Sequence, residues 1–209
     1  MGLHWHSLGV GISLKQFEQL KSRMAGGSAA AEALIDARHA KMAAQTILGI
    51  DPSLRGTGYG IIRSERGTLQ VLAQGTIACP ATWEQSRCLA NIAQTLRGVL
   101  QQQPVDVCIV EGIFFAQNLK TAIIMGAARG AALATVAEAG VEIYEIATRK
   151  VKQAIVGYGA AQKLAVAKMV QRMLGMAELP APDAADALAL ALTHAQEHGR
   201  FSLKAPKRI

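Results

Sequence analysis

The sequence TILGIDPSLRGTGYGIIRSE, residues 46–65, contains a short apolar run that ends in an acid, then a turn, then a second apolar run typical of a β-strand. Residues 68–78 (TLQVLAQGTIA) alternate between apolar and polar side chains like a third strand. Gly67 separates the second and third runs and marks a hairpin. These three segments predict an antiparallel meander at the start of the fold.

The remaining elements alternate between helix and strand. Apolar residues recur at helical spacing, Pro104 ends the first of these helices, and Asn118 can cap the next. The expected helices cover residues 83–103, 118–140, 148–156, 162–174 and 183–198, and the expected fourth and fifth strands cover 105–111 and 141–146. This order predicts an α/β fold with a five-stranded mixed sheet flanked by helices, antiparallel in the meander and parallel afterwards.

Four acidic residues are the candidate metal ligands. Asp51 and Glu111 each end a strand of the buried type, and adjacent parallel strands would bring both to one edge of the sheet. Asp183 and Asp186 are three residues apart, which places both on one face of a helix. Carboxylates gathered within a few ångströms repel one another unless a hard cation such as Mg²⁺ or Mn²⁺ neutralises them. Two such ions ~3.5–4 Å apart support in-line displacement at phosphorus.

A single acid at a strand end is more often a helix cap or one partner of a surface ion pair. The metal hypothesis therefore depends on all four acids meeting.

Five motifs carry a resemblance to a known family. In chain order they are ILGIDPS, GTGYG, IVEGIFFAQN, RKVKQAIVGYGAAQK and PDAADALALALTH. Together they resemble the RuvC family of crossover-junction endodeoxyribonucleases over residues 46–194. The resemblance implies a ribonuclease-H-like fold and a homodimer that cuts four-way Holliday junctions with two Mg²⁺ ions per active site, for which Mn²⁺ can substitute. It also implies the RuvA–RuvB branch-migration complex as a partner.

The resemblance assigns roles to seven residues. Its four acidic metal ligands correspond to Asp51, Glu111, Asp183 and Asp186. Its junction-contacting lysines correspond to Lys152 and Lys163, and its aromatic wedge corresponds to Phe114, which could stack on an unpaired base. Ser53 and Gly112 depart from the usual family pattern, and Ser53 would be strained if its turn required a positive φ.

The charge of the chain favours a polyanionic partner. Lys and Arg number 22 against 15 Asp and Glu, which gives a net charge of +7. No acid interrupts residues 149–172 or the last ten residues, so the surplus is concentrated. The three cysteines lack the spacing of a disulfide framework or zinc ribbon and are expected to be small buried groups in a cytoplasmic protein. No charge-free stretch is long enough for a membrane span.

Three segments are expected. Residues 1–41 predict a loosely attached or poorly ordered helical extension, or an artefact of start-codon choice, with Met42 as a natural beginning. Residues 42–198 predict the nuclease domain, and residues 199–209 predict a basic tail.

A four-way junction needs two matching cuts, so we expect a C2 dimer. Small residues make 118–140 its candidate helix, although the same residues would suit packing on the protein's own sheet.

Other functions remain open at this point. A catalytically silent junction-binding module, or a related nuclease acting on RNA, would share most of these motifs. A sugar-kinase or actin-like ATPase half has the same fold but needs a second, duplicated domain, for which 209 residues leave no room. His194 and His198 have metal-ligand spacing, but a solvated last helical turn is the preferred interpretation.

Overall fold

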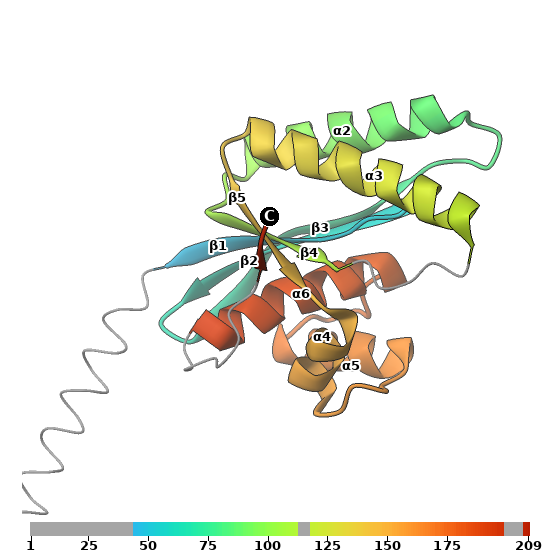
Figure 1. Ribbon diagram of the computed structural model, residues 1–209. Coiled ribbons are helices and arrows are strands. Elements are labelled where there is room, and N and C mark those ends of the chain that lie inside the picture. The colour runs from blue at the N-terminus through green and yellow to red at the C-terminus, as the bar shows by residue number, and fades with distance from the viewer. Residues whose placement is uncertain (1–43, 113–117, 199–206) are drawn as a thin grey trace, which may run out of the picture. The chain divides into compact units, whose positions relative to one another are not determined.

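The computed structural model describes residues 44–112, 118–198 and 207–209, and six strands of this part of the chain form one mixed sheet (Figure 1). The strand order is β3-β2-β1-β4-β5-β6. The strands are β1 (Gln45–Asp51), β2 (Gly56–Glu65), β3 (Thr68–Ala78), β4 (Val107–Glu111), β5 (Glu142–Ile146) and β6 (Lys207–Arg208). The sheet pairs β1 with β2 and β2 with β3 in antiparallel fashion, and β1 with β4 and β4 with β5 in parallel. The predicted α/β fold and the change of direction after the meander are confirmed.

The sixth strand corrects the predicted count of five. β6 lies within the segment expected to be only a basic tail, and it pairs antiparallel with β5. The Ile209 amide donates to the Ile143 carbonyl at 3.1 Å, and Arg208 lies 2.8 Å from Glu142. A two-residue strand carries no alternation of apolar and polar residues, so the sequence pattern could not reveal it.

The hairpin between β2 and β3 has the geometry that Gly67 predicted. Arg66 and Gly67 have φ values of 48° and 83°. Two successive positive φ values are typical of a type I′ turn, whose twist matches that of the flanking strands.

Helices cover both faces of the sheet (Figure 1). α2 (Gln85–Gln102) and α3 (Leu119–Glu138) lie over one face, and α4 (Thr148–Val156), α5 (Lys163–Met173) and α6 (Pro182–His198) lie over the other. Successive strand residues separate into the two cores, because side chains alternate across a strand. Ile47 belongs to the core beneath α6, whereas Leu48 belongs to the core beneath α2 and α3. Cys79, Cys88 and Cys108 are buried free thiols, as predicted.

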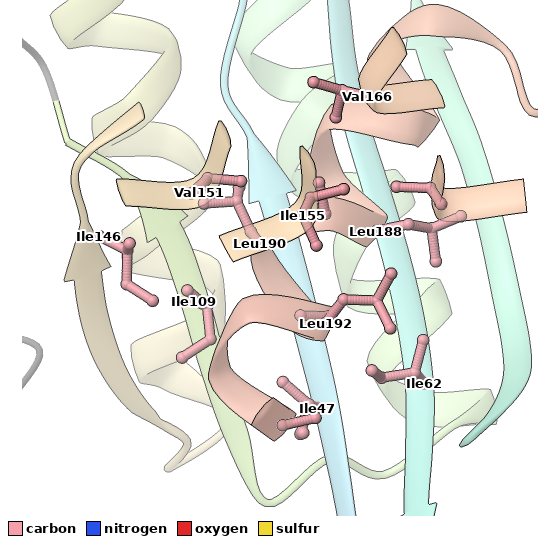
Figure 2. Packing of buried hydrophobic residues seen from close by; sticks show 14 of the residues in the cluster. Ile47, Ile62, Ile109, Ile146, Val151, Ile155, Val166, Leu188, Leu190 and Leu192 are labelled. Atoms are coloured by element: carbon pink, nitrogen blue, oxygen red, sulfur yellow. The ribbon is translucent and has the colours of Figure 1, made fainter. Parts of the chain in front are cut away.

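α6 lies unusually close to the sheet. Figure 2 shows Leu192 of this helix beside Ile62 and Ile47 of the strands. The backbones of α6 and β1 nearly touch, since a Cβ atom on Gly49 would lie 1.9 Å from the Ala187 carbonyl oxygen. The alanines of α6 are buried along most of its length, as expected for a slim helix lying against strands.

We predict that Gly49→Ala destabilises the fold by more than about 2 kcal/mol, because its methyl group would collide with the backbone of α6. Gly98→Ala is the matched control, since a Cβ there meets nothing within 4 Å. In this helix interior, alanine should stabilise by about 0.5–1 kcal/mol. Urea unfolding followed by circular dichroism measures both changes, and equal stability of the two variants would contradict the close backbone contact.

Candidate functional site

The four predicted carboxylates line a single cavity. Asp51 is the last residue of β1 and Glu111 the last of β4, and these strands are parallel neighbours paired through Ile50 and Val110. Asp183 and Asp186 lie in the first turns of α6. All four contribute to the lining of a cavity of about 320 Å³ at the carboxyl edge of the sheet. The three distant segments therefore reach one cavity.

Glycines of β2 let the start of α6 reach this edge. A Cβ on Gly58 would lie 1.9 Å from the main-chain oxygen of Asp183, and a Cβ on Gly56 would lie 2.8 Å from its carboxylate. The GTGYG motif thus serves packing at the site. The sequence pattern predicted the end of a turn at Gly56 and a strand at Gly58, and it gave no sign of the helix that lies over them.

Asp51 is the most perturbed acid of the site. The pKa of its carboxyl is raised from 3.8 to about 7; burial is the largest cause, followed by the negative charges of Glu111 and Asp186 and a hydrogen bond with Glu111. Lys163 opposes this shift of the Asp51 pKa only in part. Burial is therefore the main reason that this carboxyl resists ionisation, and the two neighbouring carboxylates add to the effect.

Two side chains of the cavity hold acids directly. The Lys163 ammonium lies 2.8 Å from Asp186, and this hydrogen bond is the main reason that the pKa of Lys163 is raised. The Thr148 hydroxyl donates to the Glu111 carboxylate. Sequence reasoning missed Thr148, because a lone threonine at a helix start is an ordinary N-terminal residue. It also treated Lys163 as a phosphate contact and did not foresee its pairing with Asp186.

The donor set suits a hard divalent cation. The cavity offers carboxylate oxygens, the ligands that Mg²⁺ and Mn²⁺ prefer. Its four acidic side chains outnumber the two positively charged side chains in the lining, Lys152 and Lys163. Across residues 44–112, 118–198 and 207–209, however, no three acidic, histidine or cysteine side chains are close enough together to hold one ion. The four acids therefore share a cavity in this structure without forming a closed cluster.

The other predicted site residues have varied outcomes. Lys152 is half-buried on α4 and lines the cavity. Phe114 lies outside the described residues. His194 is buried, with its ring centre 6.2 Å from that of Tyr144, so the interpretation of a solvated turn is wrong for this histidine. α6 stays buried closer to its C-terminal end than its polar residues indicated.

The two departures from the family pattern are accommodated. Arg66 is the only non-glycine residue with a positive φ in the described part of the chain, so the strain considered for Ser53 does not arise. The Ser53 carbonyl accepts a hydrogen bond from the buried Thr57 hydroxyl at 2.6 Å. The Gly112 amide donates to the Ile146 carbonyl at 2.9 Å and continues the parallel pairing of β4 with β5.

Comparison with known proteins gives consistent matches. A family model described as "Crossover junction endodeoxyribonuclease RuvC" matches residues 47–194. A protein of that name from Syntrophomonas wolfei is 47% identical over 149 residues, which is 71% of this chain and 87% of that protein. Another from Bordetella avium is 42% identical and covers 71% of this chain and 82% of its own length.

Solved structures agree in fold. Thermus thermophilus RuvC in complex with a Holliday junction substrate has a TM-score of 0.68 and 34% identity, covering 72% of this chain and 93% of that one. The yeast mitochondrial Holliday junction resolvase has a TM-score of 0.50 at 11% identity, over 73% of this chain and 81% of that one, and shows the fold alone.

We predict that Asp51→Asn stabilises protein kept free of divalent ions by a chelator, and more so at pH 8 than at pH 5. The folded protein holds the Asp51 proton more tightly than the unfolded chain does, so stability is lost as the pH rises from about 4 to about 7. Each pKa unit corresponds to ~1.4 kcal/mol, and asparagine removes the effect. Thermal melting at both pH values measures the difference, which should amount to several degrees at pH 8.

The control for this experiment is Glu178→Gln, which removes an exposed acid that does not line the cavity. Its melting temperature should follow the wild type at both pH values. An advantage of Asp51→Asn that is the same at pH 5 and pH 8 would contradict the raised pKa.

Proposed function

The chain belongs to the RuvC family of crossover junction endodeoxyribonucleases, and from this premise we propose how its site cuts DNA. It is a crossover junction endodeoxyribonuclease, a Holliday junction resolvase of DNA recombination and repair. We propose that it makes paired, symmetric phosphodiester cuts on opposed strands of the junction. The observation that carries this proposal is that four acids from three distant segments, together with two lysines, line one cavity.

The proposed ligands are Asp51, Glu111, Asp183 and Asp186. Membership of this nuclease family implies a metal-dependent enzyme. We propose two Mg²⁺ ions per site, with Mn²⁺ able to replace them, because the donors are all carboxylate oxygens and two-ion sites support in-line displacement at phosphorus. The raised pKa of Asp51 supports this proposal in the part that comes from the negative charges of Glu111 and Asp186, which a bound cation would offset.

The protein side of the mechanism follows from the positions of these groups. Bound divalent ions would lower the pKa of the attacking water and stabilise charge on the departing 3′ oxygen. Asp51 must be ionised to act as a ligand, so the proton that its raised pKa favours has to leave first. Thr148 keeps the Glu111 carboxylate oriented through its hydrogen bond. The close contact of Asp183 with Gly58 fixes the start of α6 at the sheet edge.

Lys152 and Lys163 are the proposed phosphate contacts. Both line the cavity, and the Lys163 side chain is 71% exposed, so it can turn from Asp186 toward a DNA phosphate. Such contacts fix the position of the junction without reading its sequence. Phe114 is the proposed stacking residue, by analogy with the aromatic wedge of the family.

A homodimer would give the two matching cuts. α3 exposes Leu119 and Ile123 in its first half, at 78% and 60% of their surface, which supports it as the dimer helix. Its second half packs against the protein itself through residues such as Ala132 and Val136.

Among the described residues α3 alone is long and apolar enough to cross a membrane, which is weak support for a span.

The remaining assignments are also proposals. We propose a cytoplasmic enzyme that acts on junction DNA away from membranes and works with the RuvA–RuvB branch-migration complex. Residues 42–198 would form the nuclease domain, between an extension over 1–41 and a basic tail over 199–209 that includes β6.

A cleavage assay tests the activity directly. Synthetic four-way junctions labelled on each strand should receive paired nicks at symmetric positions when Mg²⁺ is present. Linear duplex, single-stranded DNA and RNA duplex should be cut far more slowly. Junction binding without cutting would indicate a silent binding module, and preferential cutting of RNA would indicate the alternative nuclease.

We predict that Asp51→Asn and Asp183→Asn each abolish junction cutting and leave junction binding within a few-fold of wild type. Each change removes one ionised oxygen ligand while keeping the size of the side chain. Cutting rates and gel-shift titrations measure the two properties separately, and Glu178→Gln serves as the control with unchanged cutting. Substantial cutting by either asparagine variant would remove that residue from the proposed ligand set.

We predict that Lys163→Ala weakens junction binding and flattens its dependence on salt. Loss of one phosphate contact should reduce the slope of log K against log salt by about one unit. Lys168→Ala is the matched control, because Lys168 is exposed on the same helix and does not line the cavity. Fluorescence anisotropy between 50 and 300 mM salt gives the slopes, and equal slopes for wild type and Lys163→Ala would exclude this contact.

A further inference from the structure

Arg129 is the only buried lysine or arginine in the described part of the chain. It lies on α3, and 9% of its surface is exposed. Burying a guanidinium is unfavourable unless its donors are satisfied, so its partners are specific. The sequence motifs gave this arginine no role, because it stands among the small residues of the predicted dimer helix.

The two ends of the Arg129 fork bind different strands. Nη1 donates to the main-chain oxygen of Glu111 at 2.5 Å, and Nη2 donates to the Glu145 carboxylate at 2.5 Å. Glu111 is the last residue of β4. Glu145 lies in the neighbouring strand β5, where it pairs with Val110 of β4. One planar side chain therefore joins α3 to two parallel strands at their carboxyl ends. The fixed fork of arginine allows this double contact, which a single ammonium group cannot reproduce.

The main chain of Glu111 is held at the point where the sheet pairing ends. On one side its neighbour Gly112 donates to the Ile146 carbonyl at 2.9 Å, and on the other side Arg129 occupies the Glu111 oxygen. The carboxylate of Glu111 is held separately by the Thr148 hydroxyl. Arg129 does not line the cavity, so it acts on the backbone from which the acid projects.

We propose that Arg129 is a positioning residue for junction cutting: it holds the end of β4 so that the Glu111 carboxylate faces Asp51 in the cavity. The inference rests on the proposed role of Glu111 as a ligand. It assigns the reaction a dependence on a buried side chain of α3 that does not line the cavity.

The experiment separates positioning from folding. Arg129→Met combined with Glu145→Met removes both buried charges together, which avoids leaving Glu145 unpaired. Arg129→Lys keeps the charge and loses the fork. Arg97→Met is the matched control, because Arg97 also ties α3 to a neighbour, through Glu138 at 2.8 Å, but is exposed. Each protein is measured for melting temperature, junction Kd in EDTA, kcat at saturating junction, and hydrogen exchange at the Gly112 amide.

We expect kcat to fall at least tenfold in the double variant and by a smaller factor in Arg129→Lys. The junction Kd of both should stay within twofold of wild type. Exchange at the Gly112 amide should become faster in both. Arg97→Met should match wild type in all measurements except a small change in melting temperature. A double variant that melts near wild type and cuts at the wild-type kcat overturns the inference.

Two further outcomes are decisive. Should the double variant not fold, Arg129→Lys decides: an unchanged kcat overturns the proposal, and a reduced kcat with unchanged Kd supports it. Glu111→Gln separates the proposed role of Glu111 as a ligand from the proposed role of Arg129 as a positioning residue. If Glu111→Gln cuts normally, the proposed role of Glu111 falls and this inference falls with it. If Glu111→Gln is inactive while the Arg129 variants cut normally, only the role of Arg129 is refuted.

Discussion

The backbone of α6 rests on the backbones of β1 and β2, and the arrangement of the acidic cavity depends on this contact. Gly49 meets Ala187 in the first half of the helix, and Gly58 meets Asp183 at its start. A side chain at either glycine would push the helix outward by the size of a methyl group or more. Asp183 and Asp186 would then move away from the strand ends that carry Asp51 and Glu111. Close packing thus sets the geometry of the charges.

The charges of the cavity balance against several partners. A proton on Asp51, the ammonium of Lys163 and the hydroxyl of Thr148 each reduce the repulsion among the acids. Each of these three groups offsets less negative charge than a divalent cation does. The proton can leave Asp51, and the exposed Lys163 side chain can turn away, without a movement of the backbone. The site therefore has a stable arrangement in the protein alone and the capacity to take up positive charge. Arg129 differs from these groups, because its buried side chain binds the main-chain oxygen of Glu111 and the Glu145 carboxylate and leaves the four carboxylates of the cavity untouched.

Periodicity in the sequence was enough to predict most of the fold and the approach of the four acids. Strand ends at Asp51 and Glu111 and the spacing of Asp183 and Asp186 were informative because regular elements place such residues predictably. β6, the buried position of His194 and the pairing of Lys163 with Asp186 were not predictable in this way. Each depends on contact between segments distant in sequence, which local patterns do not record.

The short strand β6 also bears on solubility. Without it, β5 would present a free row of amide and carbonyl groups to solvent, and such rows recruit strands from other molecules. Lys207 and Arg208 occupy this border with exposed side chains, and the charge of Arg208 is paired with that of Glu142. A lysine on a short edge strand discourages two molecules from joining their sheets side by side. Growth of intermolecular β-structure is thereby opposed on this flank, and self-association is left to other surfaces.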